Sequence, residues 1–213
     1  MVKSIISLWT YLAKSQAVFI FLPIAACLIS IALRNQTAFS ALDFLALIGF
    51  LTIVFPAAGM NGTLGSLHQK ELFVSMPISS LSLGIVQPVV WLTGYGAAIS
   101  GTYYVVASTD ERSSNVVFAL FAAQAALFAL TCFIINLFKN AAIGLSLALI
   151  YMIFGMFTTG TGQGPLYLFQ WYRPRPFTAP DDLMLGQLVG TAVLLAANYI
   201  VIKYRSKFQL LPY

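Results

Sequence analysis

The chain has 213 residues, of which 60% are apolar and only 8% are charged, whereas a soluble domain carries about 25% charged residues. This composition excludes an ordinary water-soluble fold, and because one span needs about 20 apolar residues, the length allows about six spans and no soluble catalytic domain. The net charge of +5 comes from basic residues at the ends of apolar runs, a placement that indicates membrane anchoring rather than nucleic-acid binding.

The first 15 residues are predicted to form an amphipathic helix that lies on the membrane and does not cross it. Over Met1–Lys14, apolar side chains fill one half of the helical wheel and polar side chains fill the other. Trp9, flanked by Lys3 and Lys14, suits an anchor in the headgroup plane of the inner leaflet.

Six apolar runs follow, and each is long enough to be predicted as a transmembrane helix. They cover Ala17–Leu33, Ala41–Leu64, Ser82–Ala107, Val116–Phe138, Ala141–Thr159 and Leu183–Ile202. Prolines at positions 23, 56 and 88 interrupt the first three, which is tolerated where neighbouring helices satisfy the freed backbone groups. The predicted fold is therefore a single all-α transmembrane domain over residues 1–213.

Uncharged polar residues lie within these runs, and we expect them to form hydrogen bonds between helices rather than to bind ions. They are Asn61, Gln87, Gln124, Asn136, Gln187 and Asn198. Proton- and ion-coupled carriers usually place charged residues in mid-span, and no such residue is evident here. Cys27 and Cys132 fall inside apolar runs, where single thiols are most often small core residues.

The distribution of Lys and Arg predicts a multi-pass protein of the cell (cytoplasmic or inner) membrane with both termini in the cytoplasm. With this orientation the inner side holds Lys3, Lys14, Lys70, Lys139, Lys203, Arg205 and Lys207. The outer side holds Arg34, Arg112, Arg173 and Arg175.

The segment between the second and third runs, residues 67–80, is predicted to be a structured cytoplasmic elbow that another protein contacts. A helix-capable stretch from Leu67 ends before Pro77, and it carries an isolated charged pair, Lys70-Glu71. His68 is the chain's single histidine; it cannot build a zinc site alone, so we interpret it as a polar interface residue.

Motifs for catalysis and nucleotide binding are missing from the sequence. It contains no GxxxxGK[ST] loop, HExxH, CxxC or GxSxG motif. We therefore expect no enzyme activity, metal or cofactor in this chain itself. If the chain moves cargo, the energy must come from elsewhere.

This arrangement resembles the membrane subunits of type-2 ABC exporters. The shared features are the in-plane first helix, six spans with both ends inside, a short cytoplasmic elbow and a long outer segment. GTLGSLHQKELFVSMPISS, Gly62–Ser80, is similar to the family's elbow pattern of Gly-Thr, an acidic residue, Leu-rich letters and Pro-Ile/Val-Ser. One position departs from that pattern, because Asn61 stands where a charged residue usually precedes the Gly-Thr.

The resemblance implies that Leu67–Met76 is a coupling helix that docks on a separate ATPase subunit, which would hold the ATP and Mg. The implied coupling residues are Leu67, His68, Gln69, Lys70, Glu71, Leu72, Phe73, Ser75, Met76 and Pro77. A second permease copy or a paralogue would complete the transporter, and membrane lipid would surround it. The expected cargo is hydrophobic or amphipathic: a peptide, a lipid-like molecule or an antibiotic.

Two other functions remain open from the sequence. One is a non-transporting assembly subunit of the haem-exporter kind, and the other is a carrier or channel that needs no ATPase. Within the outer segment, residues 160–182, an aromatic and basic group stands between prolines: Trp171, Tyr172, Arg173 and Arg175. It is predicted to be either a re-entrant gate that touches an acidic or amphipathic substrate, or an anchor at headgroup depth.

Overall fold

The regular structure that the computed structural model describes is entirely helical. It describes residues 2–34, 41–65, 79–108, 112–157, 168 and 181–204. The first helices are α1 (Val2–Ser15) and α2 (Ala17–Leu33), joined through the single non-helical residue Gln16. The predicted bounds of both helices are confirmed to within a residue or two.

The second apolar run forms one continuous but irregular helical rod. It consists of α3 (Ala41–Phe44), the π-helical turn η1 (Leu45–Gly49), the 3-10 turn η2 (Leu51–Ile53) and α4 (Val54–Gly65). These irregular turns come just before Pro56, which lacks the N–H that a regular helix requires at that place.

The third run begins with another π-helical turn, η4 (Ser82–Val86), which continues into α6 (Gln87–Val106). The remaining helices are α7 (Ser114–Phe138), α8 (Ala141–Phe157) and α9 (Asp181–Lys203). Each of them matches a predicted apolar run.

Four of these rods are long and apolar enough to cross a membrane, as expected for an integral membrane protein. They cover Ala41–Gly62, Ser82–Val106, Ser114–Phe138 and Met184–Lys203. The helices α2 and α8 have 17 residues each, or about 25 Å at 1.5 Å per residue. They are therefore somewhat shorter than the hydrocarbon core. Over the residues that the structure describes, length and composition support four crossings, and the six predicted crossings stay a prediction.

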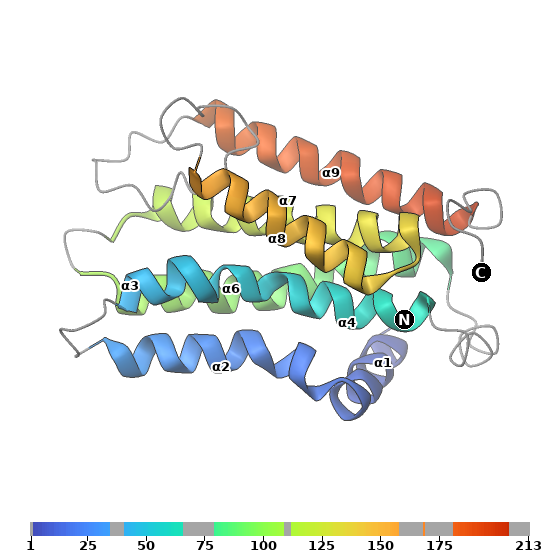
Figure 1. Cartoon of the computed structure of the whole chain (residues 1–213), viewed down its shortest axis with the longest axis horizontal. Helices are drawn as coiled ribbons and strands as arrows, with labels where there is room; N and C mark the ends of the chain where they lie inside the picture. Colours follow the sequence, from blue (N-terminus) through green and yellow to red (C-terminus); the bar gives the residue numbers. More distant parts are fainter. Residues whose placement is uncertain are drawn as a thin grey trace.

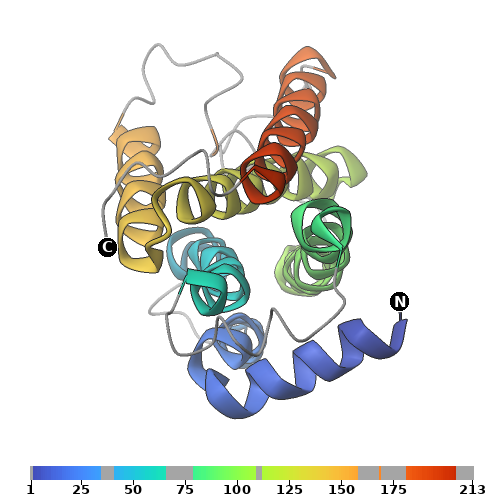
Figure 2. The ribbon, with the colours of Figure 1, turned by 90° about the vertical axis from the view of Figure 1, so that its right-hand side faces the viewer.

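The long helices lie side by side in one bundle, with α7 at its centre (Figures 1 and 2). The helix α7 packs against α4, α6, α8 and α9, and alanines such as Ala119 and Ala123 are fully buried there. Figure 2 looks along the bundle and shows α1 lying across it. We call the end that carries α1 the inner end, and the opposite end the outer end.

The inner end also holds the C-terminal ends of α4, α7 and α9 and the start of η4 (Figure 1). The backbones of η4 and α9 approach closely there, because a Cβ atom on Gly84 would lie 2.7 Å from the Tyr199 Cα. The turn between α7 and α8 is equally tight: Lys139 adopts a left-handed conformation with φ of 54°. Helix backbones therefore approach closely at the inner end of the bundle.

Candidate functional site

Three buried asparagines from three helices meet near the inner end of the bundle. Asn61 comes from α4, Asn136 from α7 and Asn198 from α9, and their exposed fractions are 1%, 5% and 0%. The Asn136 Nδ2 atom lies 2.7 Å from the Asn61 Oδ1 and 2.8 Å from the Asn198 Oδ1. We call these three residues the asparagine cluster.

Asn61 also ties the cluster to its own helix and to α7. Its Nδ2 donates to the Ala57 carbonyl at 2.8 Å and lies 3.2 Å from the Cys132 Sγ. Cys27 and Cys132 are both free and buried, as the sequence predicted for core thiols. Cys132 thus has a specific hydrogen-bond partner in addition to its packing role.

On its other side the cluster extends to the start of the helical rod that η4 and α6 form together, which we call the third rod. The Asn198 Nδ2 donates to the Gly84 carbonyl at 3.0 Å. In a regular helix that carbonyl accepts from the residue four positions later, which here is Pro88 and has no N–H. The proline therefore leaves an acceptor in η4 that a side chain of α9 satisfies.

The cluster consequently joins the two rods on either side of residues 66–78 through α7 and α9. Asn61 lies near the end of α4, before that segment, and Gly84 lies in η4, after it. A relative displacement of these two rods cannot occur without changing hydrogen bonds in the cluster.

The bonding in the cluster can change, because the Asn136 side-chain nitrogen faces more acceptors than it has hydrogens. The Asn136 Nδ2 also lies 3.0 Å from the Cys132 carbonyl, so it faces three acceptors with only two hydrogens. At least two bonding patterns therefore exist for nearly the same atom positions, and a small helix shift can favour one over the other.

Polar atoms near the start of α6 are left without hydrogen-bond partners. Gln87 is fully buried, and neither its Nε2 nor its Oε1 is hydrogen-bonded; the Ser82 Oγ and the Gln124 Oε1 share this condition. A buried unsatisfied polar group costs about 1–3 kcal/mol. The start of α6 therefore contains a buried amide group whose hydrogen-bonding capacity is not used within the described part of this chain.

The site is uncharged. Among the side chains that the structure describes, none of the buried polar ones is ionisable apart from the thiols and tyrosines, and no three His, Cys, Asp or Glu residues gather. Amides, hydroxyls and carbonyls can hold helices in a given register but cannot accept and release protons near neutral pH.

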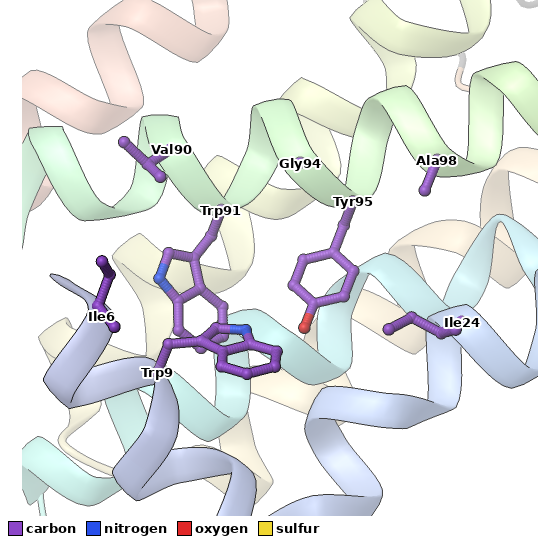
Figure 3. Close-up of a pocket in the computed structure, with 8 residues that line it drawn as sticks. All are labelled: Ile6, Trp9, Ile24, Val90, Trp91, Gly94, Tyr95 and Ala98. Carbon is purple, nitrogen blue, oxygen red and sulfur yellow. The ribbon is translucent and has the colours of Figure 1, made fainter.

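A second feature is an apolar groove between α1, α2 and α6, with a volume of about 360 Å³. Figure 3 shows Trp91 and Tyr95 pointing from α6 toward Trp9 of α1 and Ile24 of α2. The Tyr95 hydroxyl donates to the Ile20 carbonyl at 3.0 Å, in the turn of α2 that precedes Pro23. A hydrogen bond thus joins two walls of the groove, α6 and α2.

Most site residues predicted from the sequence lie outside the described residues. This holds for every predicted coupling residue from Leu67 to Pro77 and for the predicted gate residues Trp171, Tyr172, Arg173 and Arg175. Of the predicted anchors, Lys3 and Lys14 lie on α1, and Lys14 is exposed. Trp9 is 39% exposed and packs edge-on against Phe21 of α2, with ring centroids 6.3 Å apart.

Sequence reasoning identified the asparagines as residues that bond between helices, which the structure confirms. The same prediction was wrong for Gln87, whose buried side chain has no hydrogen-bond partner among the described residues. It did not pair them with one another or with Gly84, although the Pro88 four residues later was a signal of a free carbonyl. It missed the groove, since Gly94 and Ala98 of α6 carry no chemical signature of their own.

Comparison with protein-family models, curated proteins and solved structures found no match to this chain. The resemblance of Gly62–Ser80 to an exporter elbow therefore stays an expectation.

Proposed function

We propose that this chain is the membrane permease subunit of an ABC transporter of the type-2 exporter kind. In this proposal α2 and α8 complete six crossings, and both termini lie in the cytoplasm. A separate subunit hydrolyses ATP with Mg, and a second permease copy or paralogue completes the pathway. The cargo is hydrophobic or amphipathic, such as a peptide, a lipid-like molecule or an antibiotic.

The observation that carries this proposal is the position of the asparagine cluster. It links the ends of both rods that flank the predicted elbow to α7, the central helix, and to α9. A force applied to the elbow by a partner would reach α7 and α9 directly, without first disturbing the outer half of the bundle.

The proposed mechanism follows from the two bonding patterns available to Asn136. Closure of the ATPase subunits moves the elbow, the ends of α4 and η4 shift, and Asn136 exchanges one acceptor for another. The membrane subunit supplies two states of similar free energy, and ATP binding supplies the bias between them. Uncharged amides suit this role, because they change partners without moving a charge within the membrane.

A carrier driven by protons or ions is a weaker proposal on the same observations. Such carriers use ionisable residues in their spans, whereas the polar groups buried in the described rods are mainly amides and hydroxyls.

The first experiment is affinity purification of the tagged chain from its native membrane, followed by ATP hydrolysis measurements on the purified complex in liposomes. We expect the chain to retain an ATPase that carries a P-loop and an ABC signature. Candidate cargo should stimulate hydrolysis in the assembled complex and not in the ATPase alone.

Scrambling the sequence of Lys70–Ser75 tests the coupling to ATP hydrolysis separately from the folding of the chain. We expect the variant chain to insert and to keep its thermal stability while losing cargo-stimulated hydrolysis. A scramble of the outer residues 160–165 serves as the control and should leave the ATPase bound. Transport by the purified chain without any ATPase, or full transport by the Lys70–Ser75 scramble, would contradict the proposal.

A further inference from the structure

The groove between α1, α2 and α6 has an aromatic floor and an open, apolar rim. Trp91 and Tyr95 form the floor and are 3% and 8% exposed. The rim residues Ile6, Val90 and Ile24 are 59%, 45% and 38% exposed. Its volume of about 360 Å³ falls within the roughly 300–1,000 Å³ that is usual for small-molecule sites.

The groove opens onto a continuous apolar surface of a kind that lipid chains contact in a membrane. Large apolar side chains of α2 and α6 continue from its rim, including Phe21, Leu28 and Val89, and all of them are exposed. Its other wall is α1, which lies across the inner end of the bundle (Figure 2). The groove therefore runs from the depth of an in-plane helix toward the hydrocarbon region.

The charge of α1 is complementary to a phospholipid headgroup. Its charged residues are Lys3 and Lys14, and it has no acidic residue. Basic residues on the polar face of an interfacial helix are attracted to anionic lipids. The apolar groove and the basic helix beside it thus match the two parts of one phospholipid molecule.

We propose that the groove binds one acyl chain of a bilayer phospholipid, with the anionic headgroup of that lipid next to α1. The lipid fills the space between Trp9 and the α6 floor and thereby joins α1 to the third rod. This role does not depend on an ATPase partner, so it stands or falls separately from the proposed function.

Two glycines of α6 provide a matched pair of variants. A Cβ atom on Gly94, which lines the groove, or on Gly101, which does not, would meet nothing within 4 Å. Both glycines are exposed and lie in the same helix. Gly94→Leu therefore adds a side chain at the groove whose Cβ has room, and Gly101→Leu makes the same change away from the groove.

Native mass spectrometry of the purified full chain, released from nanodiscs of phosphatidylglycerol and phosphatidylcholine, tests the proposal. We expect the wild type and Gly101→Leu to retain a tightly bound phospholipid, preferentially phosphatidylglycerol. We expect Gly94→Leu to lose it. Equal retention by all three proteins overturns the proposal.

Fluorescence quenching locates the acyl chain. In a Trp9→Phe, Trp171→Phe background, only the buried Trp91 emits, and lipids with brominated acyl chains quench a tryptophan that they contact. We expect this background to retain its phospholipid in native mass spectrometry, because position 9 keeps an aromatic ring. We expect strong quenching of Trp91 that falls several-fold with Gly94→Leu and is unchanged with Gly101→Leu. Weak quenching in every variant overturns the proposal.

Should Gly94→Leu fail to fold, Ala98→Leu fills the same groove, and the exposed neighbour Ala97 supplies the control Ala97→Leu. If a second copy of the chain occupied the groove, Gly94→Leu would lower the oligomer mass while Trp91 stayed unquenched in the wild type. That outcome also overturns the proposal.

Discussion

At the residue scale, the most informative position is Asn61. It stands where the exporter elbow pattern usually has a charged residue, and it is 1% exposed. A charge there would be costly unless it were paired, whereas an amide is satisfied by the Asn136 amide, Ala57 and Cys132. The departure from the pattern is therefore explained by the burial of this position among three helices.

Asn136→Ala should destabilise the bundle, because it removes the donor shared by Asn61 and Asn198. Interhelical hydrogen bonds in membranes contribute about 0.6 kcal/mol each, up to about 1.7, and unpaired buried acceptors add to the loss. We expect a decrease of about 1–3 kcal/mol in the free energy of unfolding, measured by SDS titration in mixed micelles.

Asn115→Ala is the matched control, since Asn115 lies on the same helix but is exposed. It should leave stability nearly unchanged. In a double-mutant cycle, Asn136→Ala and Asn198→Ala should be strongly non-additive; additive effects would show that the cluster is not a unit.

At the element scale, the third rod shows how a proline shapes a contact. Pro88 removes a donor from the ladder of η4 and α6, and Asn198 of α9 donates to the Gly84 carbonyl instead. The same glycine permits the backbones of η4 and α9 to approach, so one short stretch determines both the packing and the hydrogen bonding of this helix pair.

Gly84→Ala should separate η4 from α9, because its Cβ would lie 2.7 Å from the Tyr199 Cα and 3.0 Å from its Cβ. Overpacking of this kind costs about 1–3 kcal/mol, and we expect that decrease in the unfolding free energy. Gly101→Ala, in open space on α6, should instead stabilise the helix by about 0.5–1 kcal/mol. Equal effects of the two substitutions would contradict the close approach.

At the scale of the whole molecule, helix positions followed from the sequence far better than contacts did. Apolar runs determine where a helix must shield its backbone from lipid, so the bounds of α2 and α7 were predicted closely. The helix faces that pack together are determined by shape complementarity between residues far apart in the chain, such as Gly84 and Tyr199. Such complementarity leaves no periodic pattern in the sequence. The groove could not be predicted either, because it exists where small residues such as Gly94 and Ala98 leave space between helices.

The predicted orientation can be tested with two single cysteines. Ser79 lies at the inner end and Ser114 at the start of α7 at the outer end, and both are exposed. We expect a membrane-impermeant maleimide to label Ser114→Cys in intact cells and Ser79→Cys only after permeabilisation. The native thiols are buried and provide the unlabelled baseline; labelling of both variants from outside would contradict the orientation.

The link between α1 and α2 has a consequence for the choice of membrane. In the proposed six-span topology α2 crosses the bilayer with only 17 residues, and Gln16 alone joins it to α1, which lies at the membrane surface. Such a span has little freedom to move deeper into the bilayer or to lengthen. The bilayer then adjusts to the protein by becoming thinner around the junction of α1 and α2. We therefore expect the reconstituted chain to melt at a higher temperature in short-chain than in long-chain phosphatidylcholine, as a sensor of bilayer thickness would.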